Sequence, residues 1–265
     1  MYLKFICCDV FARIACELVS KSPNIVDIEF VPMLAHVNPL KLKEMIKEKI
    51  DNNTGESSRK YDAVILGFGL CGNAVIGLSC TVPMIIPRAN DCCTIHMGSK
   101  ARFLEEFGNI LSARWCSTGY FERGRLLHTG FTDLEQLANY KTSAEYMEYV
   151  EKYDEETADY LWETLHPKME TSESVYIRID GFEHSNSYEQ YKADMDAADV
   201  KLKTVEGDIS LLRALVDGEW DDGRFLTIPP GKLIVGIYDM DRVMSAGCAT
   251  HPCEECASGA NSFSP

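Results

Sequence analysis

The sequence contains no uninterrupted apolar run of the about 18 residues that a membrane-spanning helix requires. Its first segment, MYLKFICCDVFARIACEL, is apolar overall, but it carries Lys4, Asp9 and Arg13 and lacks the layout of a secretory signal peptide. We therefore expect a cytoplasmic protein that does not enter a membrane.

Basic residues are also scarce. Lys and Arg number 26 against 41 Asp and Glu, which gives a net charge of −15. Proteins that bind nucleic acids present a basic face to the phosphate backbone, so this charge balance argues against a nucleic-acid partner.

The signals of a disulfide framework are missing as well, although the chain has eleven cysteines. Cytosolic thiols stay reduced, and an odd number of cysteines at irregular spacing cannot pair completely. Two roles remain for each cysteine: a small buried hydrophobic residue, or a ligand of a metal or cluster. Position along the chain has to separate the two roles.

Short apolar runs alternate with helical patterns along most of the chain. This alternation predicts an α/β fold with two Rossmann-like lobes, in which parallel sheets are flanked by helices and an acidic helical segment joins the lobes. The stretch CGNAVIGLSC, residues 71–80, is expected to be a short helix, and RFLTIPPG, residues 224–231, to be the last strand of the second lobe. The expected domains are an N-terminal lobe at 1–130, a helical connector at 131–170, a C-terminal lobe at 171–240 and a cysteine-rich tail at 241–265. The connector is rich in tyrosine and is expected either to cover the site as a lid or to form a homodimer contact.

Cysteines follow three of the expected strands. The first strand ends at Cys7 and Cys8, Cys71 follows the third, and Cys92 and Cys93 follow the fourth. Ligands of open α/β sheets bind at the carboxyl ends of the strands, whereas core cysteines have no reason to gather there. Three thiolates at one sheet edge are typical of zinc with water as a fourth ligand, or of a [4Fe–4S] cluster with one iron open to substrate.

Polar residues flank these cysteines. Arg88, Asp91 and Asn73 are expected to face a small anionic ligand, because a guanidinium fork suits a carboxylate or phosphate. An ion pair between Arg88 and Asp91 is the alternative. GFGLCG, residues 67–72, matches the dinucleotide fingerprint G-x-G-x-x-G, but no acidic residue ends a strand at the ribose-binding position, which argues against a nicotinamide or flavin cofactor.

Two blocks, LxxGLCGNAxxGL and PRANDCCTIHMGS, together with ICCDVFARI near the start and LLRALVDGEWDDGRFLTIPPG near the end, resemble the DUF1638 family over residues 1–235. The resemblance implies an α/β protein without an assigned activity. Such proteins occur in methanogens and other anaerobes, often encoded beside corrinoid-dependent methyltransferases. The cysteines of the family pattern correspond to Cys8, Cys71 and Cys92 of this chain, and its arginine and aspartate correspond to Arg88 and Asp91. It has a histidine where this chain has Asn90, so a proton donor at that position would be missing here.

A separate run of cysteines lies beyond the family blocks. Cys248, Cys253 and Cys256 form a C-x4-C-x2-C run, which matches the spacing of the first three ligands of a plant-type ferredoxin cluster. With His251 the same run would suit zinc. We expect a second metal site, a ligand for the first site, or an inert tail.

The leading hypothesis is an iron–sulfur protein of anaerobic one-carbon or corrinoid methyl metabolism. Cys8, Cys71 and Cys92 would hold a [4Fe–4S] cluster, and a cluster-dependent enzyme would use it for Lewis-acid or redox chemistry on a small substrate. The alternatives are a non-catalytic accessory module that binds zinc or a corrinoid methyltransferase partner, and a zinc-thiolate methyltransferase.

Overall fold

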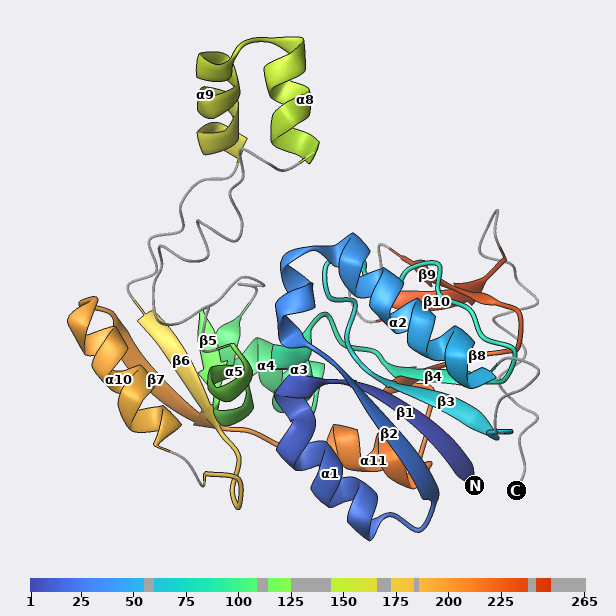
Figure 1. Ribbon diagram of the computed structural model, residues 1–265. Helices are drawn as coiled ribbons and strands as arrows, with labels where there is room; N and C mark the ends of the chain where they lie inside the picture. The colour runs from blue at the N-terminus through green and yellow to red at the C-terminus, as the bar shows by residue number, and fades with distance from the viewer. Residues whose placement is uncertain are drawn as a thin grey trace.

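Five strands form the larger of the main sheets in this computed structural model (Figure 1), in the order β2-β1-β3-β4-β8. Their bounds are Tyr2–Cys8 (β1), Ile25–Val31 (β2), Ala63–Gly67 (β3), Met84–Pro87 (β4) and Phe225–Ile228 (β8). The first four strands are parallel, and β8 is antiparallel to β4. The structure describes residues 1–54, 60–108, 114–124, 144–165, 173–183, 186–237 and 242–248.

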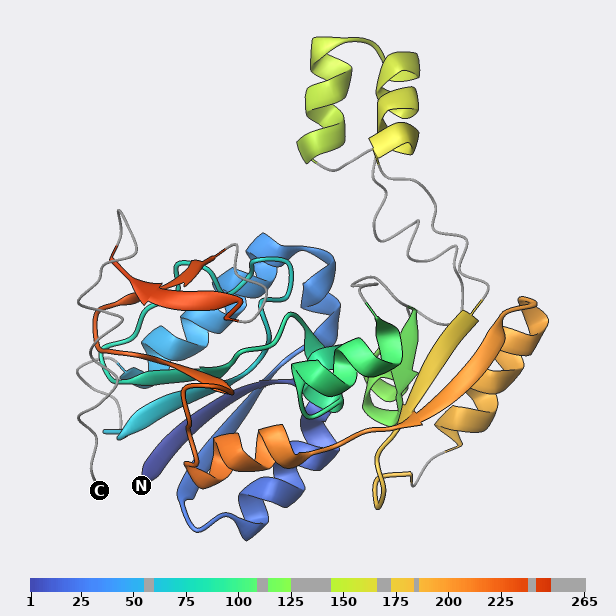
Figure 2. The same ribbon diagram turned by 180° about the vertical axis from the view of Figure 1, so that it is seen from behind.

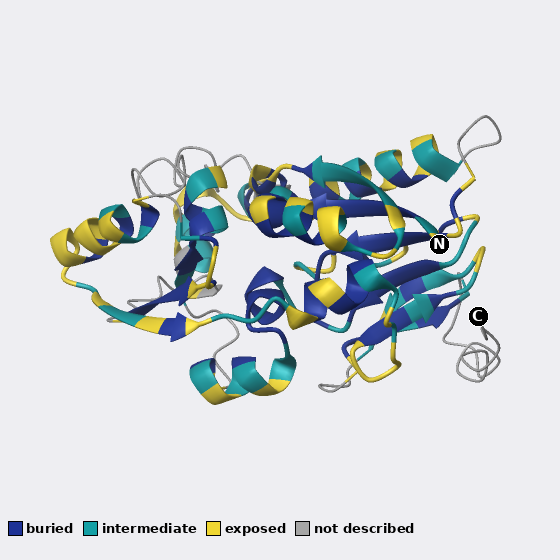
Figure 3. Ribbon diagram, turned by 90° about the horizontal axis from the view of Figure 1, so that it is seen from below, coloured by how far each residue is buried: buried dark blue, intermediate teal, exposed yellow. Residues whose placement is uncertain are grey.

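Helices cover both faces of this sheet. Helix α2 (Pro39–Thr54) lies on one face, and α1 (Ala12–Lys21) and α11 (Ser210–Asp217) lie together on the other (Figures 1 and 2). Every residue of β3 and β4 is buried, as expected for apolar strands of a parallel sheet covered on both sides. Strands β1, β3 and β4 form the buried centre of the larger sheet, whereas the edge strand β2 is mostly only partly buried (Figure 3).

A smaller sheet has three parallel strands in the order β5-β6-β7. The strands are Trp115–Ser117 (β5), Glu173–Arg178 (β6) and Lys201–Glu206 (β7). Helices α5 (Thr118–Arg123) and α10 (Ser187–Ala197) pack beside them. The two sheets meet where α5 packs on the short 3-10 helix η1 (Asp9–Phe11), and a β-carbon on Gly119 would collide with the Val10 carbonyl there. The contact is therefore one of backbone against backbone.

The other elements complete the two sheets. They are the 3-10 helix η2 (Met33–Val37), α3 (Cys92–His96), α4 (Lys100–Phe107), the antiparallel ribbon of β9 (Leu233–Gly236) and β10 (Met244–Gly247), and the helices α8 (Ala144–Lys152) and α9 (Glu155–Leu165). Helices α8 and α9 pack on each other and stand apart from both sheets (Figure 1). They fall in the expected connector, and its roles as a lid or a homodimer contact stay predictions.

The predicted α/β class is confirmed, since both main sheets contain parallel strands and are flanked by helices, and the division into two lobes stays a prediction. Two local expectations differ from the structure. The strand expected in the second lobe, β8, pairs with β4 of the larger sheet, and residues 71–77 form turns instead of a helix. No helix in the described part of the chain is long and apolar enough to cross a membrane.

Candidate metal centre

Three of the predicted cysteines lie together at the carboxyl ends of neighbouring strands. Cys8 ends β1, Cys71 lies in the turn after β3, and Cys92 begins helix α3 after β4. The Cys92 thiol lies close enough to the thiols of Cys71 and Cys8 that both raise its pKa. Because β1, β3 and β4 are parallel neighbours, their ends meet at one edge of the sheet, as the sequence predicted.

A fourth group, which the sequence analysis missed, joins these thiols. His36 belongs to η2, the 3-10 helix that follows β2, and its Nε2 lies 3.4 Å from the Cys8 Sγ. The ligand atoms of Cys8, His36 and Cys92 all lie within 4.8 Å of one another. Cys71 also lies near His36 and raises the pKa of its ring. These three residues could therefore hold a metal ion, and Cys71 lies beside them without belonging to this group of ligand atoms.

The Cys71 turn is held against the Cys92 segment by backbone contacts. The amide of Leu70 donates to the Ala89 carbonyl at 2.8 Å, and the amide of Cys71 donates to the Asn90 carbonyl at 2.9 Å. The backbone φ of Cys71 is 47°, in the left-handed region that non-glycine residues seldom adopt. Strain of this kind persists only where surrounding structure imposes it, and it gathers at functional sites.

The four side chains perturb one another's pKa values. Burial raises the pKa of Cys8, but hydrogen bonds with Cys92 and His36 outweigh it and lower that pKa to about 7. Hydrogen bonds with Cys92 and His36 likewise lower the pKa of Cys71 to about 6 against the effect of burial. Burial lowers the pKa of His36, but its bonds to Cys71 and Cys8 raise it to about 10. Thiolates near neutral pH are the form of cysteine that binds metals.

The adjacent cysteines have a different environment. Cys7 is fully buried and its Sγ lies 3.9 Å from the Gly67 carbonyl, and Cys93 is 1% exposed. Burial raises the pKa of both thiols, so both stay protonated. Successive residues of a strand point to opposite sides, which is why Cys8 reaches the site and Cys7 packs in the core.

The predicted polar residues lie near this edge of the sheet with other contacts. The Arg88 Nε donates to the carbonyls of Asp222 and Phe225, and its Nη1 donates to those of Arg242 and Met244. Asp91 caps helix α3, because its Oδ1 accepts hydrogen bonds from the Thr94 amide at 2.9 Å and the Thr94 hydroxyl at 3.0 Å. Asn73 is exposed beside Cys71, with a φ of 69°.

The tail cysteines are only partly described. Cys248 follows β10, and its Sγ lies 3.1 Å from the Nζ of Lys232. Lys232 follows β8, which runs antiparallel to β4 and ends beside the start of β4. Cys248 therefore lies toward the opposite end of the larger sheet from Cys8, Cys71 and Cys92. Cys253, Cys256 and His251 lie outside the described residues.

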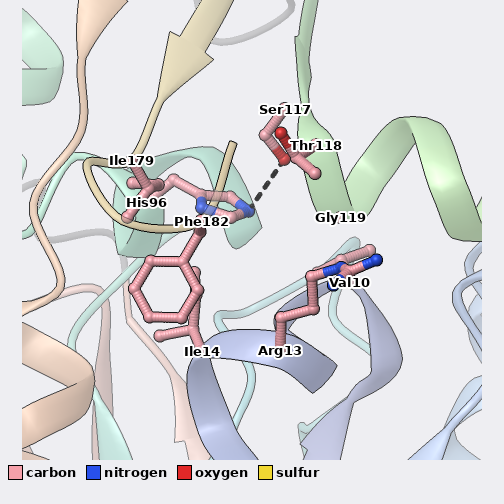
Figure 4. A pocket seen from close by; sticks show the side chains of 9 residues that line it. All are labelled: Val10, Arg13, Ile14, His96, Ser117, Thr118, Gly119, Ile179 and Phe182. Atoms are coloured by element: carbon pink, nitrogen blue, oxygen red, sulfur yellow. Dashed lines mark hydrogen bonds between the residues drawn. The ribbon is translucent and has the colours of Figure 1, made fainter. Parts of the chain in front are cut away.

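A small pocket lies between the two sheets, with space for about one water molecule (Figure 4). Its lining includes Arg13 of α1, His96 of α3 and Ser117 at the end of β5, and the His96 Nε2 lies 3.2 Å from the Ser117 Oγ. His96 is 2% exposed, and burial lowers its pKa to about 3, so the ring is neutral. Its ring packs between Phe11 and Trp115, which makes it a core histidine.

Comparison with known proteins gives one match. The family model described as a protein of unknown function (DUF1638) matches residues 30–216, a span that contains His36, Cys71 and Cys92 and begins after Cys8. Neither curated proteins nor solved structures include a significant match to this chain.

Proposed function

The chain belongs to the DUF1638 family, and we propose that it is a metal protein in which Cys8, Cys71, Cys92 and His36 bind a single zinc-class ion. The distance of 3.4 Å between the Cys8 Sγ and the His36 Nε2 carries this proposal. In a tetrahedral site with zinc–sulfur bonds of about 2.3 Å and zinc–nitrogen bonds of about 2.0 Å, a sulfur and a nitrogen ligand lie about 3.5 Å apart. Cys8 and His36 are therefore spaced for one ion, and the Cys92 Sγ lies within 4.8 Å of both ligand atoms.

A three-cysteine [4Fe–4S] cluster is the second candidate, since three thiols from separate strand ends suit a cluster with one open iron. A cluster places iron and sulfide atoms between its cysteines, whereas the Sγ atoms of Cys8 and Cys92 lie within 4.8 Å of each other. A cluster would require these side chains to move apart. The spacing therefore favours the single ion.

Bound zinc supplies Lewis-acid chemistry, including the deprotonation of a thiol that binds to it. The residues around the site determine how a ligand could reach the bound ion. Cys8 and Cys92 are buried, whereas Cys71 is partly exposed and is followed by exposed Gly72 and Asn73. A small anionic ligand would approach past the Cys71 turn, where the exposed Asn73 side chain could donate a hydrogen bond to it.

The metabolic setting is part of the proposal and rests on the family resemblance. We place the chain in the cytoplasm of an anaerobe, in one-carbon or corrinoid methyl metabolism, with a corrinoid protein or methyltransferase as partner. A catalytic centre would transfer a methyl group to or from a small thiol. An accessory module would form a stable complex with the corrinoid protein, and the complex would show no turnover.

The deciding experiment is metal and acid-labile sulfide analysis after strictly anaerobic purification. Two matched pairs serve as variants and controls: Cys92→Ser with Cys93→Ser, and Cys8→Ser with Cys7→Ser. We expect about one zinc per chain and no sulfide, with metal lost in Cys92→Ser and Cys8→Ser and retained in the neighbouring variants. Iron and sulfide of about four each would establish the cluster instead, and about eight would add the tail as a second centre. Absence of metal from the wild-type protein would overturn both candidates.

A further inference from the structure

One side chain of the metal site, His36, belongs to a short 3-10 helix. Helix η2, which carries His36, is a 3-10 helix of five residues whose N-cap, Pro32, makes no side-chain cap bond. Short 3-10 helices have poor hydrogen-bond geometry, and their first amides lack partners within the helix. The position of His36 therefore depends on contacts from outside η2.

Asp9 supplies such a contact. It directly follows Cys8, and its Oδ1 accepts a hydrogen bond from the amide of Met33, the first residue of η2, at 2.8 Å. A carboxylate on the first amides of a helix is a cap, and here the cap comes from a different strand end. One short segment of chain thus contains a metal ligand, Cys8, and the side chain that fixes the helix of another ligand.

Two further contacts brace the same loop. The His36 ring stacks on Phe68 with ring centroids 6.2 Å apart, and Gly124 at the end of α5 lies against the Met33 side chain. The charged groups that act on the Asp9 carboxylate are Arg123 of α5 and His36 itself. Asp9 does not belong to the described group of side chains whose ligand atoms lie within 4.8 Å of one another.

We propose that Asp9 is a positioning residue, which caps η2 from the end of β1 and thereby holds His36 in the metal site. This inference rests on the proposed metal function for its effect on metal, and on the Asp9–Met33 hydrogen bond alone for its effect on η2. Groups that orient a metal ligand without touching the metal typically change metal affinity by about 10–100-fold when removed.

The test compares Asp9→Ala and Asp9→Asn in the full chain loaded with Co²⁺. Asp9→Ala removes the acceptor and is expected to weaken Co²⁺ binding by about 10–100-fold and to shift the ligand-field bands toward those of His36→Ala, with thiolate charge-transfer bands retained. Asp9→Asn keeps an acceptor oxygen for the Met33 amide and is expected to resemble the wild type. Asp154→Ala is the control, since it removes a 2.7 Å cap on the Thr157 amide at the start of α9.

A metal-free measurement separates this inference from the metal proposal. Hydrogen–deuterium exchange of residues 32–38 in the metal-free protein is expected to accelerate in Asp9→Ala and not in Asp9→Asn. If exchange accelerates in Asp9→Ala but the wild type binds no Co²⁺, the proposed metal function is wrong. Asp9 would then still be the residue that orders η2 and His36. Unchanged exchange, unchanged ligand-field bands in Asp9→Ala, or equal loss of metal in Asp9→Asn would each overturn the positioning role.

Discussion

A β-carbon added to Gly69 would lie 2.6 Å from the backbone nitrogen of Asp91, which is closer than such atoms approach. The two segments that bear Cys71 and Cys92 are packed together at this point. Gly69→Ala is therefore expected to push the Cys71 turn away from Cys92, to reduce metal content at least tenfold and to lower the free energy of unfolding by about 1–3 kcal/mol. Metal analysis and denaturant unfolding measure both effects. Gly223→Ala, where the nearest atom is an Asp221 side-chain oxygen at 3.2 Å, is the control.

Arg88 is expected to act as a clamp on the larger sheet. Its bonds to four backbone carbonyls join β4 to β8 and to the residues at the start of β10. Lysine cannot reproduce this fork, so Arg88→Lys is expected to lower the free energy of unfolding by about 2–4 kcal/mol while metal content stays unchanged. If Arg88→Lys instead kept the stability of the wild type and no longer bound an anionic ligand, Arg88 would be a ligand-binding residue. Arg224→Lys, at an exposed ion pair with Asp221, serves for comparison.

The buried His96 is expected to make stability depend on pH. Its pKa in the folded protein is about 3, below the ordinary value of 6.5, so its contribution is complete above pH 6.5 and is lost as pH falls toward 3. The wild type should lose up to about 1.4 kcal/mol per pH unit in this window relative to His96→Phe, whose ring cannot gain a proton. Urea unfolding of both proteins at pH 7, 6 and 5 measures the difference. If the free energies of unfolding of the two proteins changed equally with pH, His96 would gain its proton in the folded protein at its ordinary pKa.

Glu29 couples a buried lysine to helix α2. Burial would raise its pKa, but hydrogen bonds from Lys4, Lys49 and Asn53 lower it to about 2. Its contribution to stability is therefore complete above about pH 4.5 and is lost as pH falls toward 2.

Glu29→Gln leaves Lys4, which is 4% exposed, without its carboxylate. We expect a loss of about 2 kcal/mol at pH 7, below the range for fully buried pairs because Glu29 is partly exposed. Chemical denaturation at pH 7 and pH 2.5 should show that the difference in free energy of unfolding between the wild type and Glu29→Gln is smaller at pH 2.5. Asp51→Asn, which breaks an exposed pair with Lys47, should change stability by less than about 0.5 kcal/mol. An equal loss in both variants would contradict the buried pair.

The three strand-end cysteines could be predicted because strand direction alone decides where they meet. Cys8, Cys71 and Cys92 each follow a β-branched or apolar run, and the runs are neighbours in a parallel sheet. His36 was not predicted because no cysteine accompanies it, although it follows the end of β2 by five residues. A search for any metal-binding side chain after each expected strand would have found it.

Other features depend on partners far along the chain. The polar sequence around Arg88 indicated a ligand fork, but the carbonyls that Arg88 binds belong to residues 222–244. Likewise, strand–helix alternation gives the order of strands and not their sheet, so β8 was expected in the second lobe. Nothing in RFLTIPPG distinguishes an antiparallel edge strand of the first sheet from a parallel strand of the second.

The pairing of β4 with β8 has a consequence for the newly made chain. Met84 pairs with Ile228, so the larger sheet lacks its edge strand until the smaller sheet and the α8–α9 helices have left the ribosome. During that interval β4 presents open backbone groups that could pair with other strands. Pairing of β8 with β4 removes this open edge, and the hydrogen bonds of Arg88 to the Asp222 and Phe225 carbonyls then hold β8 in place.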